Sequence, residues 1–205
     1  MRIRVKAVVS LAVVAMAAFG LAPTAQAAEP SPPPVTPSSA AADALFSTGP
    51  VPPEILAKRQ QSASSTVNLC YSSETRNVGM NRFLCSPAES GFTGTTGLGE
   101  PLESVEFIFM APTVMQAQVR VHFAGMGWGS WKTVVSNYTI RFGAPGTAGP
   151  AIEAINFRST NGTFEGAGHI MNNPNWVGTG VLSDITIGTT GEARWLEAFW
   201  VVPHY

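Results

Sequence analysis

The chain has 205 residues, 12% of them charged, and a formal net charge of −1 at pH 7. This balance excludes the strongly basic surface that nucleic-acid binding needs, so we expect no nucleic-acid partner. Beyond the N-terminus no segment stays apolar over the roughly 18 residues needed to cross a bilayer, and we expect no membrane insertion of the mature protein.

Residues 1–27 have the pattern of a secretory signal peptide. Three basic residues fall within the first six positions, an apolar run covers 7–22, and Ala25-Gln26-Ala27 has the small residues of a cleavage site. A retained anchor is the alternative, but the apolar run is short for one and polar sequence follows it. The alanine-rich signal is typical of bacteria. We therefore predict a mature protein that is secreted or held at the cell surface.

Residues 28–66 are rich in proline, serine and alanine and contain eight of the sixteen prolines. Such sequence favours extended polyproline geometry and behaves as a semi-rigid spacer, so we predict a tether. The alternative is a disordered tail that has no function. A short helix is predicted within it, at 52–61, with Pro53 in its first turn.

Cys70 and Cys85 are the only cysteines. In an exported protein, two thiols at this separation are predicted to form one disulfide, which in the chain-entropy model stabilises the fold by about 3 kcal/mol. No histidine lies nearby in the sequence to complete a metal site. We expect neither a metal nor a cofactor.

Residues 67–205 contain three related segments, at about 67–110, 111–160 and 161–205. Each has a glutamate that follows a Gly-Thr-x-Gly turn and precedes an apolar strand. The glutamates are Glu103, Glu153 and Glu197, and the turns are 94–97, 146–149 and 188–191.

The periodicity of this region is that of β-strands. Apolar residues alternate with polar ones from Ala117 to Phe123, and turn residues recur every eight to twelve positions. About four short strands are expected in each repeat. A unit of that size cannot bury its apolar face alone, so we predict an all-β fold in which three units close around a pseudo-threefold axis, as a β-prism or a β-trefoil. An open solenoid is less favoured with three units.

The repeat glutamates are predicted to be structural. Alternation from Glu103 through Val105, Phe107 and Phe109 places the carboxylate on an apolar face, where it needs hydrogen bonds. We expect each glutamate to accept backbone N–H groups from its own glycine turn. The alternative is an acid/base pair of a hydrolase, which a threefold arrangement disfavours because it spreads the three carboxylates apart.

Aromatic residues at bends are the candidate ligand contacts, because indole faces stack on sugar rings or partner side chains. These are Trp128, Trp131, Trp176 and Trp200. Core packing is the alternative for each. His122 and His169 precede Trp128 and Trp176 at matching places and are expected to face solvent, whereas the first repeat has Met80 where a Trp would fall.

The second repeat resembles the ChW repeat, a clostridial hydrophobic repeat with a characteristic Trp. The resemblance is carried by Gly127-Trp128, by the turn at 146–149 and by Ile152-Glu153-Ala154. The third repeat keeps Trp176, its turn and Leu-Glu-Ala, with Asn in place of the preceding Gly; the first lacks the Trp. The resemblance implies secreted or surface proteins that take part in adhesion or bind polymers, and it implies no catalytic residue.

These observations favour a non-catalytic binding or adhesion module whose partner is a carbohydrate, a cell-wall polymer or a surface protein. One alternative is a small extracellular polysaccharide hydrolase that uses Glu103, Glu153 or Glu197. Another is a structural envelope protein.

Overall fold

The computed structural model describes residues 39–61, 68–110, 116–134, 138–146 and 148–204. The predicted signal peptide and part of the predicted tether lie outside these residues. The described residues belong to one compact unit, Val35–Tyr205. Most of them are in β-strands and the helices among them are short, so the predicted β character is confirmed.

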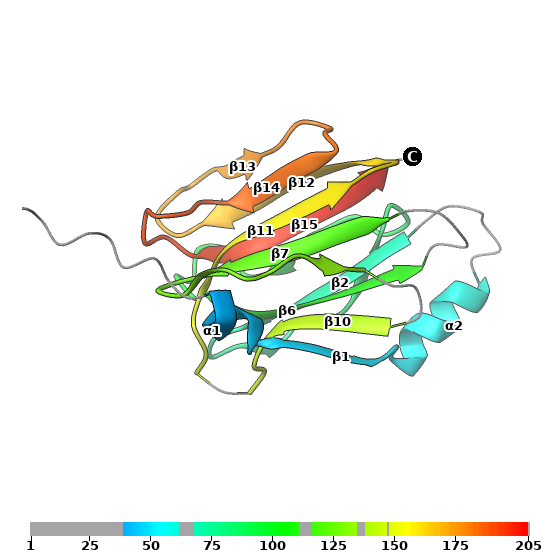
Figure 1. The fold of residues 1–205 in the computed structure, drawn as a ribbon, viewed down its shortest axis with the longest axis horizontal. Helices are drawn as coiled ribbons and strands as arrows, with labels where there is room; N and C mark the ends of the chain where they lie inside the picture. Colours follow the sequence, from blue (N-terminus) through cyan, green and yellow to red (C-terminus); the bar gives the residue numbers. More distant parts are fainter. Residues whose placement is uncertain (1–38, 62–67, 111–115, 135–137, 147, 205) are drawn as a thin grey trace, which may run out of the picture. The chain divides into compact units, whose positions relative to one another are not determined.

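The strands form three antiparallel sheets, each built mainly from one repeat (Figure 1). Sheet 1 has the order β1 (Phe46–Pro50), β10 (Tyr138–Gly143), β6 (Leu102–Met110), β2 (Asn68–Thr75) and β3 (Gly79–Met80), and β4 (Leu84–Ser86) also pairs with β2. Sheet 2 has the order β14 (Asp184–Gly188), β11 (Ile152–Ser159), β7 (Ala117–Phe123) and β8 (Gly127–Trp128), and β9 (Lys132–Thr133) also pairs with β7. Sheet 3 has the order β13 (Trp176–Gly178), β12 (Thr163–Ile170), β15 (Leu196–His204) and β5 (Thr93–Gly94).

Each repeat gives one strand to a neighbouring sheet. β5 of the first repeat pairs with β15 of the third, β10 of the second pairs with β6 of the first, and β14 of the third pairs with β11 of the second. A repeat is therefore not a self-contained sheet, and the three depend on one another for backbone hydrogen bonds.

Glycine is required where each exchanged strand ends. Gly94, Gly143 and Gly188 have φ of +104°, +97° and +105°. A Cβ at these positions would come within 2.1–2.3 Å of a backbone oxygen of the neighbouring repeat, namely that of Glu197, Glu103 and Glu153 respectively. Only a residue without a side chain allows this approach.

This geometry corrects the predicted turn of the second repeat. Gly143 and Gly146 have φ of +97° and +72°, which match the values of +104° and +74° at Gly94 and Gly97. The second turn is therefore 143–146 and not 146–149. The Gly-Thr-x-Gly spelling at 146–149 is a coincidence, because the backbone selects glycine at two fixed positions and leaves the residues between them free.

Each repeat glutamate lies at a β-bulge. In the second repeat Phe123 pairs with Ile152 and His122 pairs with Ala154, which leaves Glu153 without a partner, and the same register shift occurs at the other two glutamates. The bulge inserts one residue, so the core positions on either side are three apart instead of two, as at Ile152 and Ile155. The prediction that the glutamate shares the core face with the residues after it is therefore wrong.

The three sheets share one hydrophobic core. Phe107 of sheet 1 lies at its centre, with ring centroids 5.1 Å from Phe157 of sheet 2 and 6.0 Å from Phe199 of sheet 3. No single sheet covers its own inner face, which is why three repeats fold as one unit.

Part of the predicted tether is folded onto sheet 1. Residues 39–61 form α1 (Ser39–Asp43), β1 and α2 (Pro53–Gln61), and α1 and α2 lie at opposite ends of β1 (Figure 1). β1 pairs with β10, and the fully buried Ile55 of α2 packs on the disulfide between Cys70 and Cys85. The predicted helix and the predicted disulfide are confirmed, whereas a free tether is wrong for these residues.

Candidate functional site

Each repeat glutamate contacts a basic side chain of its own sheet. Glu103 lies 2.5 Å from Arg76, Glu153 lies 2.9 Å from His122, and Glu197 lies 2.8 Å from His169. All three glutamates are nearly fully buried. The carboxylates are thus compensated by neighbouring cations or ring nitrogens, which supports the structural role.

The predicted contact between each glutamate and its own turn is wrong. Gly97 of the first repeat donates its backbone N–H to Glu197 of the third repeat, at 3.4 Å. Gly146 of the second repeat donates to Glu74 of the first, at 2.9 Å. Because strands are exchanged, these two turns contact carboxylates of the neighbouring sheet, and the third turn donates from Thr189 N to the backbone oxygen of Glu153.

His122 and His169 do not face solvent as predicted, and their side chains are only 15% and 12% exposed. Burial lowers the pKa of His122 below its usual value of 6.5, and the charge of Glu153 only partly opposes this. Burial thus disfavours the charged imidazole, although its Nδ1 lies 2.9 Å from the Glu153 carboxylate.

The register places a Trp at the same point in two sheets. Trp128 pairs with His122, Trp176 pairs with His169, and Met80 takes this position in sheet 1, as the sequence predicted. The indole and imidazole rings meet edge-on in both sheets, with centroids 5.1 and 5.7 Å apart. Beyond this shared pair, the surroundings of the two tryptophans differ.

Trp176 and Trp200 line one cavity of about 410 Å³, which we call the aromatic cavity. Its other lining residues come from the first repeat and from the end of β15: Tyr71, Ser86, Glu89, Ser90, Gly91, Phe92 and Val202. The ring of Phe92 lies 5.2 Å from that of Trp176 and is 44% exposed. The structure thus brings together two of the four predicted aromatic contacts and adds the rings of Phe92 and Tyr71.

Phe92 reaches this place because it directly precedes β5, the strand that the first repeat gives to sheet 3. Sequence reasoning missed Phe92. The only available signal was its position beside the first glycine turn, and that signal has meaning only if strand exchange is known.

The aromatic cavity contains a polar atom without a partner. Ser86 is 1% exposed and its Oγ has no hydrogen-bond partner among the described residues. Glu89 is in contrast fully engaged, since Lys58 lies 2.8 Å away and the backbone N–H of Cys85 donates to it at 2.7 Å. An unsatisfied buried hydroxyl is costly.

Trp128 and Trp131 lie on sheet 2, in what we call the Trp–Arg ladder (Trp128, Arg120, Trp131 and Arg158). The Arg120 guanidinium lies 4.5 Å from the Trp128 ring centroid and 4.4 Å from that of Trp131. The Arg158 guanidinium lies 3.9 Å from the Trp131 centroid. These indoles are stacked on cations of their own sheet, which leaves them less available to a sugar than the rings of the aromatic cavity.

The bend that carries Trp131 is held by the N-terminal segment. Asp43 at the end of α1 accepts hydrogen bonds from Ser130 N at 2.9 Å and from Ser130 Oγ at 2.5 Å, and it pairs with Lys132 at 3.0 Å. The Ser130 hydroxyl is the main reason why the pKa of Asp43 is below its usual value. The carboxylate of Asp43 thus fixes the residues on both sides of Trp131. Asp43 lies in the segment that was predicted from the sequence to be a tether.

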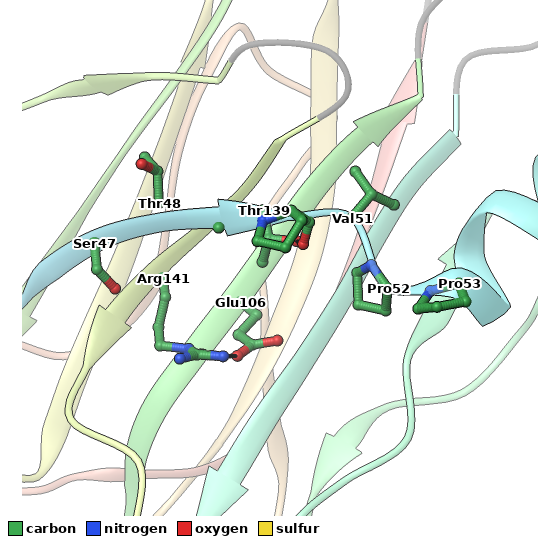
Figure 2. A pocket seen from close by; sticks show the side chains of 10 residues that line it. Ser47, Thr48, Val51, Pro52, Pro53, Glu106, Thr139 and Arg141 are labelled. Atoms are coloured by element: carbon green, nitrogen blue, oxygen red, sulfur yellow. Dashed lines mark hydrogen bonds and ion pairs between the residues drawn. The ribbon is translucent and has the colours of Figure 1, made fainter.

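A further cavity, of about 320 Å³, is lined by residues 47–53 and by Glu106, Thr139 and Arg141 of sheet 1. Figure 2 shows Arg141 beside Glu106, with Pro52 and Pro53 at one end of the site. The two charges form an ion pair with each other. This cavity therefore offers a ligand no uncompensated charge.

Comparison of the chain with protein-family models, with curated proteins and with solved structures found no match. The resemblance to the ChW repeat therefore stays a prediction. Of the helices in the described part of the chain, none has the length and apolar character to cross a membrane.

Proposed function

We propose that this protein is a non-catalytic binding module that holds a neutral sugar ring of an extracellular glycan in the aromatic cavity. The observation that carries the proposal is the grouping of Trp176, Trp200 and Phe92 around one cavity, which Ser86 with its unpartnered hydroxyl also lines. Aromatic faces contribute apolar contact to a sugar ring, while a hydroxyl that lacks a protein partner can bond to a ring hydroxyl.

The size and charge of the cavity support this ligand class. A volume of about 410 Å³ falls at the lower end of the range for small-molecule sites, which suits one or two sugar rings. Its carboxylate, Glu89, is neutralised by Lys58, so the cavity favours neither anions nor cations.

Binding without hydrolysis is part of the proposal. A glycosidase needs two carboxylates facing one bond, with one of them free to carry a proton. Each repeat glutamate is instead buried against its own basic partner on its own sheet. We expect no release of reducing ends from any glycan that the protein binds.

The test is a glycan array followed by titration of each hit, with tryptophan emission as the readout. Trp176→Ala should weaken binding about tenfold or more, and Trp128→Ala on sheet 2 is the matched control that should leave it unchanged. Ser86→Ala should weaken binding without lowering the melting temperature, because the hydroxyl has no partner in the protein. The proposal fails if no glycan shifts the emission, or if Trp128→Ala and Trp176→Ala act alike.

We also propose that the three units close around a pseudo-threefold axis as a β-prism, and that the mature protein works outside the cytoplasm. The cyclic exchange of β5, β10 and β14 supports the first proposal. The disulfide supports the second, because such bonds persist in oxidising compartments. Small-angle scattering of the folded unit and detection of the protein in the culture medium or on the cell surface test the two.

A further inference from the structure

The arginines of sheet 2 differ from most others in the described chain. Arg76, Arg141 and Arg194 each form an ion pair with a glutamate. Arg120 reaches a carboxylate only indirectly: its Nε donates to Asn156 at 3.1 Å, and Asn156 donates to Asp184 at 2.7 Å. Arg158 forms no ion pair with any described carboxylate, and its Nε donates to the neutral Gln118 at 2.7 Å.

Arg158 is nevertheless held in place. Its guanidinium stacks on Trp131 at 3.9 Å, and Trp131 is fixed in turn by the contacts of Asp43 with Ser130 and Lys132. The second guanidinium of the ladder stacks on the same indole at 4.4 Å, so two positive charges share one ring. An unpaired and immobilised arginine loses little rotamer freedom when it binds an anion.

Arg158 lines a cavity of about 430 Å³ whose other walls are polar and uncharged. They are formed by Gln116, Gln118, Thr133, Ser159 and Thr160. Amide and hydroxyl groups can donate to an oxyanion, and no carboxylate lines the cavity to repel one.

We propose that this cavity is a second ligand site, which binds an oxyanion through Arg158. The ligand is a carboxylate or a phosphate carried by an acidic extracellular polymer, and the polar walls would contact the hydroxyl groups beside it. The site is independent of the aromatic cavity, since it lies on another sheet and shares no residue with it.

General electrostatic attraction does not account for such binding. The chain has 13 acidic and 12 basic residues, and removal of the predicted signal peptide takes away basic residues only. The protein as a whole would therefore repel a polyanion, and binding would require a local site.

The experiment is isothermal titration of the folded protein with three probes at low salt: inorganic phosphate, tri-galacturonic acid and the neutral maltotriose. We expect at least one acidic probe to bind while maltotriose produces no heat from this site. Arg158→Gln should weaken the acidic probe about tenfold or more, since a charge-assisted hydrogen bond is lost. Arg82→Gln removes an exposed arginine between β3 and β4 and should leave binding unchanged.

A second pair of variants guards against a folding defect in Arg158→Gln. Thr160 is exposed at the rim of the cavity, so Thr160→Asp adds a negative charge there without touching the ladder, and Thr160→Asn is its neutral control. The aspartate should abolish binding of the acidic probe and the asparagine should not. Tighter binding of tri-galacturonate than of phosphate identifies a carboxylated glycan; the reverse identifies a phosphate ester.

Three results would overturn the inference: neither acidic probe binds, Arg158→Gln binds as the unmodified protein does, or Arg82→Gln loses as much affinity as Arg158→Gln. Because Trp176→Ala removes the aromatic cavity and leaves this site intact, acidic-probe binding by that variant separates the two proposals.

Discussion

Sheets 2 and 3 place a tryptophan at the same register position, next to a histidine that contacts a buried glutamate. In sheet 2 this tryptophan stacks on Arg120, whereas in sheet 3 it packs against Phe92, and both of these rings line the aromatic cavity. The difference comes from residues outside the repeat pattern: charged residues on the outer face of sheet 2 and a phenylalanine that the first repeat brings to sheet 3. The repeat pattern thus fixes the position of the tryptophan, and the side chains around the tryptophan determine what it can bind.

In sheet 1 the same register position holds no tryptophan. Ile55 of α2 packs with Ile108 over the disulfide of this sheet. Met80, at the position equivalent to the two tryptophans, is 49% exposed at the edge of the sheet.

The largest effect is expected at a glycine that ends an exchanged strand. Gly188→Ala would place a Cβ 2.2 Å from the oxygen of Glu153 at a φ of +105°, and should cost about 3 kcal/mol of unfolding free energy or more. Gly191→Ala is the matched control, with φ +75° and open space around it, and should cost about 1 kcal/mol. Urea denaturation measures both. Equal losses would mean that strand exchange does not require glycine there.

The next largest effect is expected at the buried glutamates, one of which lies in sheet 2 and one in sheet 3. Glu153→Gln and Glu197→Gln should each lower the free energy of unfolding by about 1–3 kcal/mol, because a buried charged partner is lost. Glu192→Gln, on an exposed side chain, should stay within about 0.5 kcal/mol. A Glu153→Gln protein that is fully stable but has lost a hydrolytic activity would refute the structural role.

A smaller and local effect separates sheet 2 from sheet 3. Asp43→Asn weakens the hold on Ser130 and Lys132, and should cost about 1 kcal/mol while changing the Trp131 environment. Glycan binding in the aromatic cavity should be unaffected. Thermal denaturation and near-UV circular dichroism measure the first effect. Loss of glycan binding in this variant would show that the two faces are coupled.

The smallest effect is a pH dependence specific to sheet 2. Because the pKa of His122 is lower in the folded protein than its usual 6.5, the unfolded chain binds more protons as the pH falls below that value. Stability should therefore decrease on acidification from pH 7 toward the lowered pKa, and His122→Asn should reduce this decrease. Urea midpoints at several pH values above 5 measure it, in a window above the titration of the carboxylates. An unchanged slope in the variant would contradict the assignment.

Several features of the candidate sites follow from local sequence. The period-two pattern at 117–123 predicts the strand, the spacing of the tryptophans predicts their shared register, and Pro53 marks the start of a helix. These succeed because alternation, turn chemistry and proline geometry act over a few residues.

Other features depend on contacts that no local pattern contains. The bulge that turns Glu153 off the core face adds a single residue to one strand, and alternation alone cannot reveal it. The folded segment at 39–61 has the composition of a linker, yet its strand β1 pairs with β10 at the edge of sheet 1. Hydrogen bonding to an available sheet edge outweighs composition there.

The sequence by itself determined that residues 67–205 fold mainly as β-strands and that Cys70 and Cys85 form a disulfide. Only the tertiary structure decided which repeat completes which sheet, and with it which side chains meet at a surface. The reason is physical: strand hydrogen bonds are the same for every partner, so pairing between repeats is selected by the shared core and by close backbone approach at three glycines. The aromatic cavity results from that selection, because β5 brings Phe92 to sheet 3.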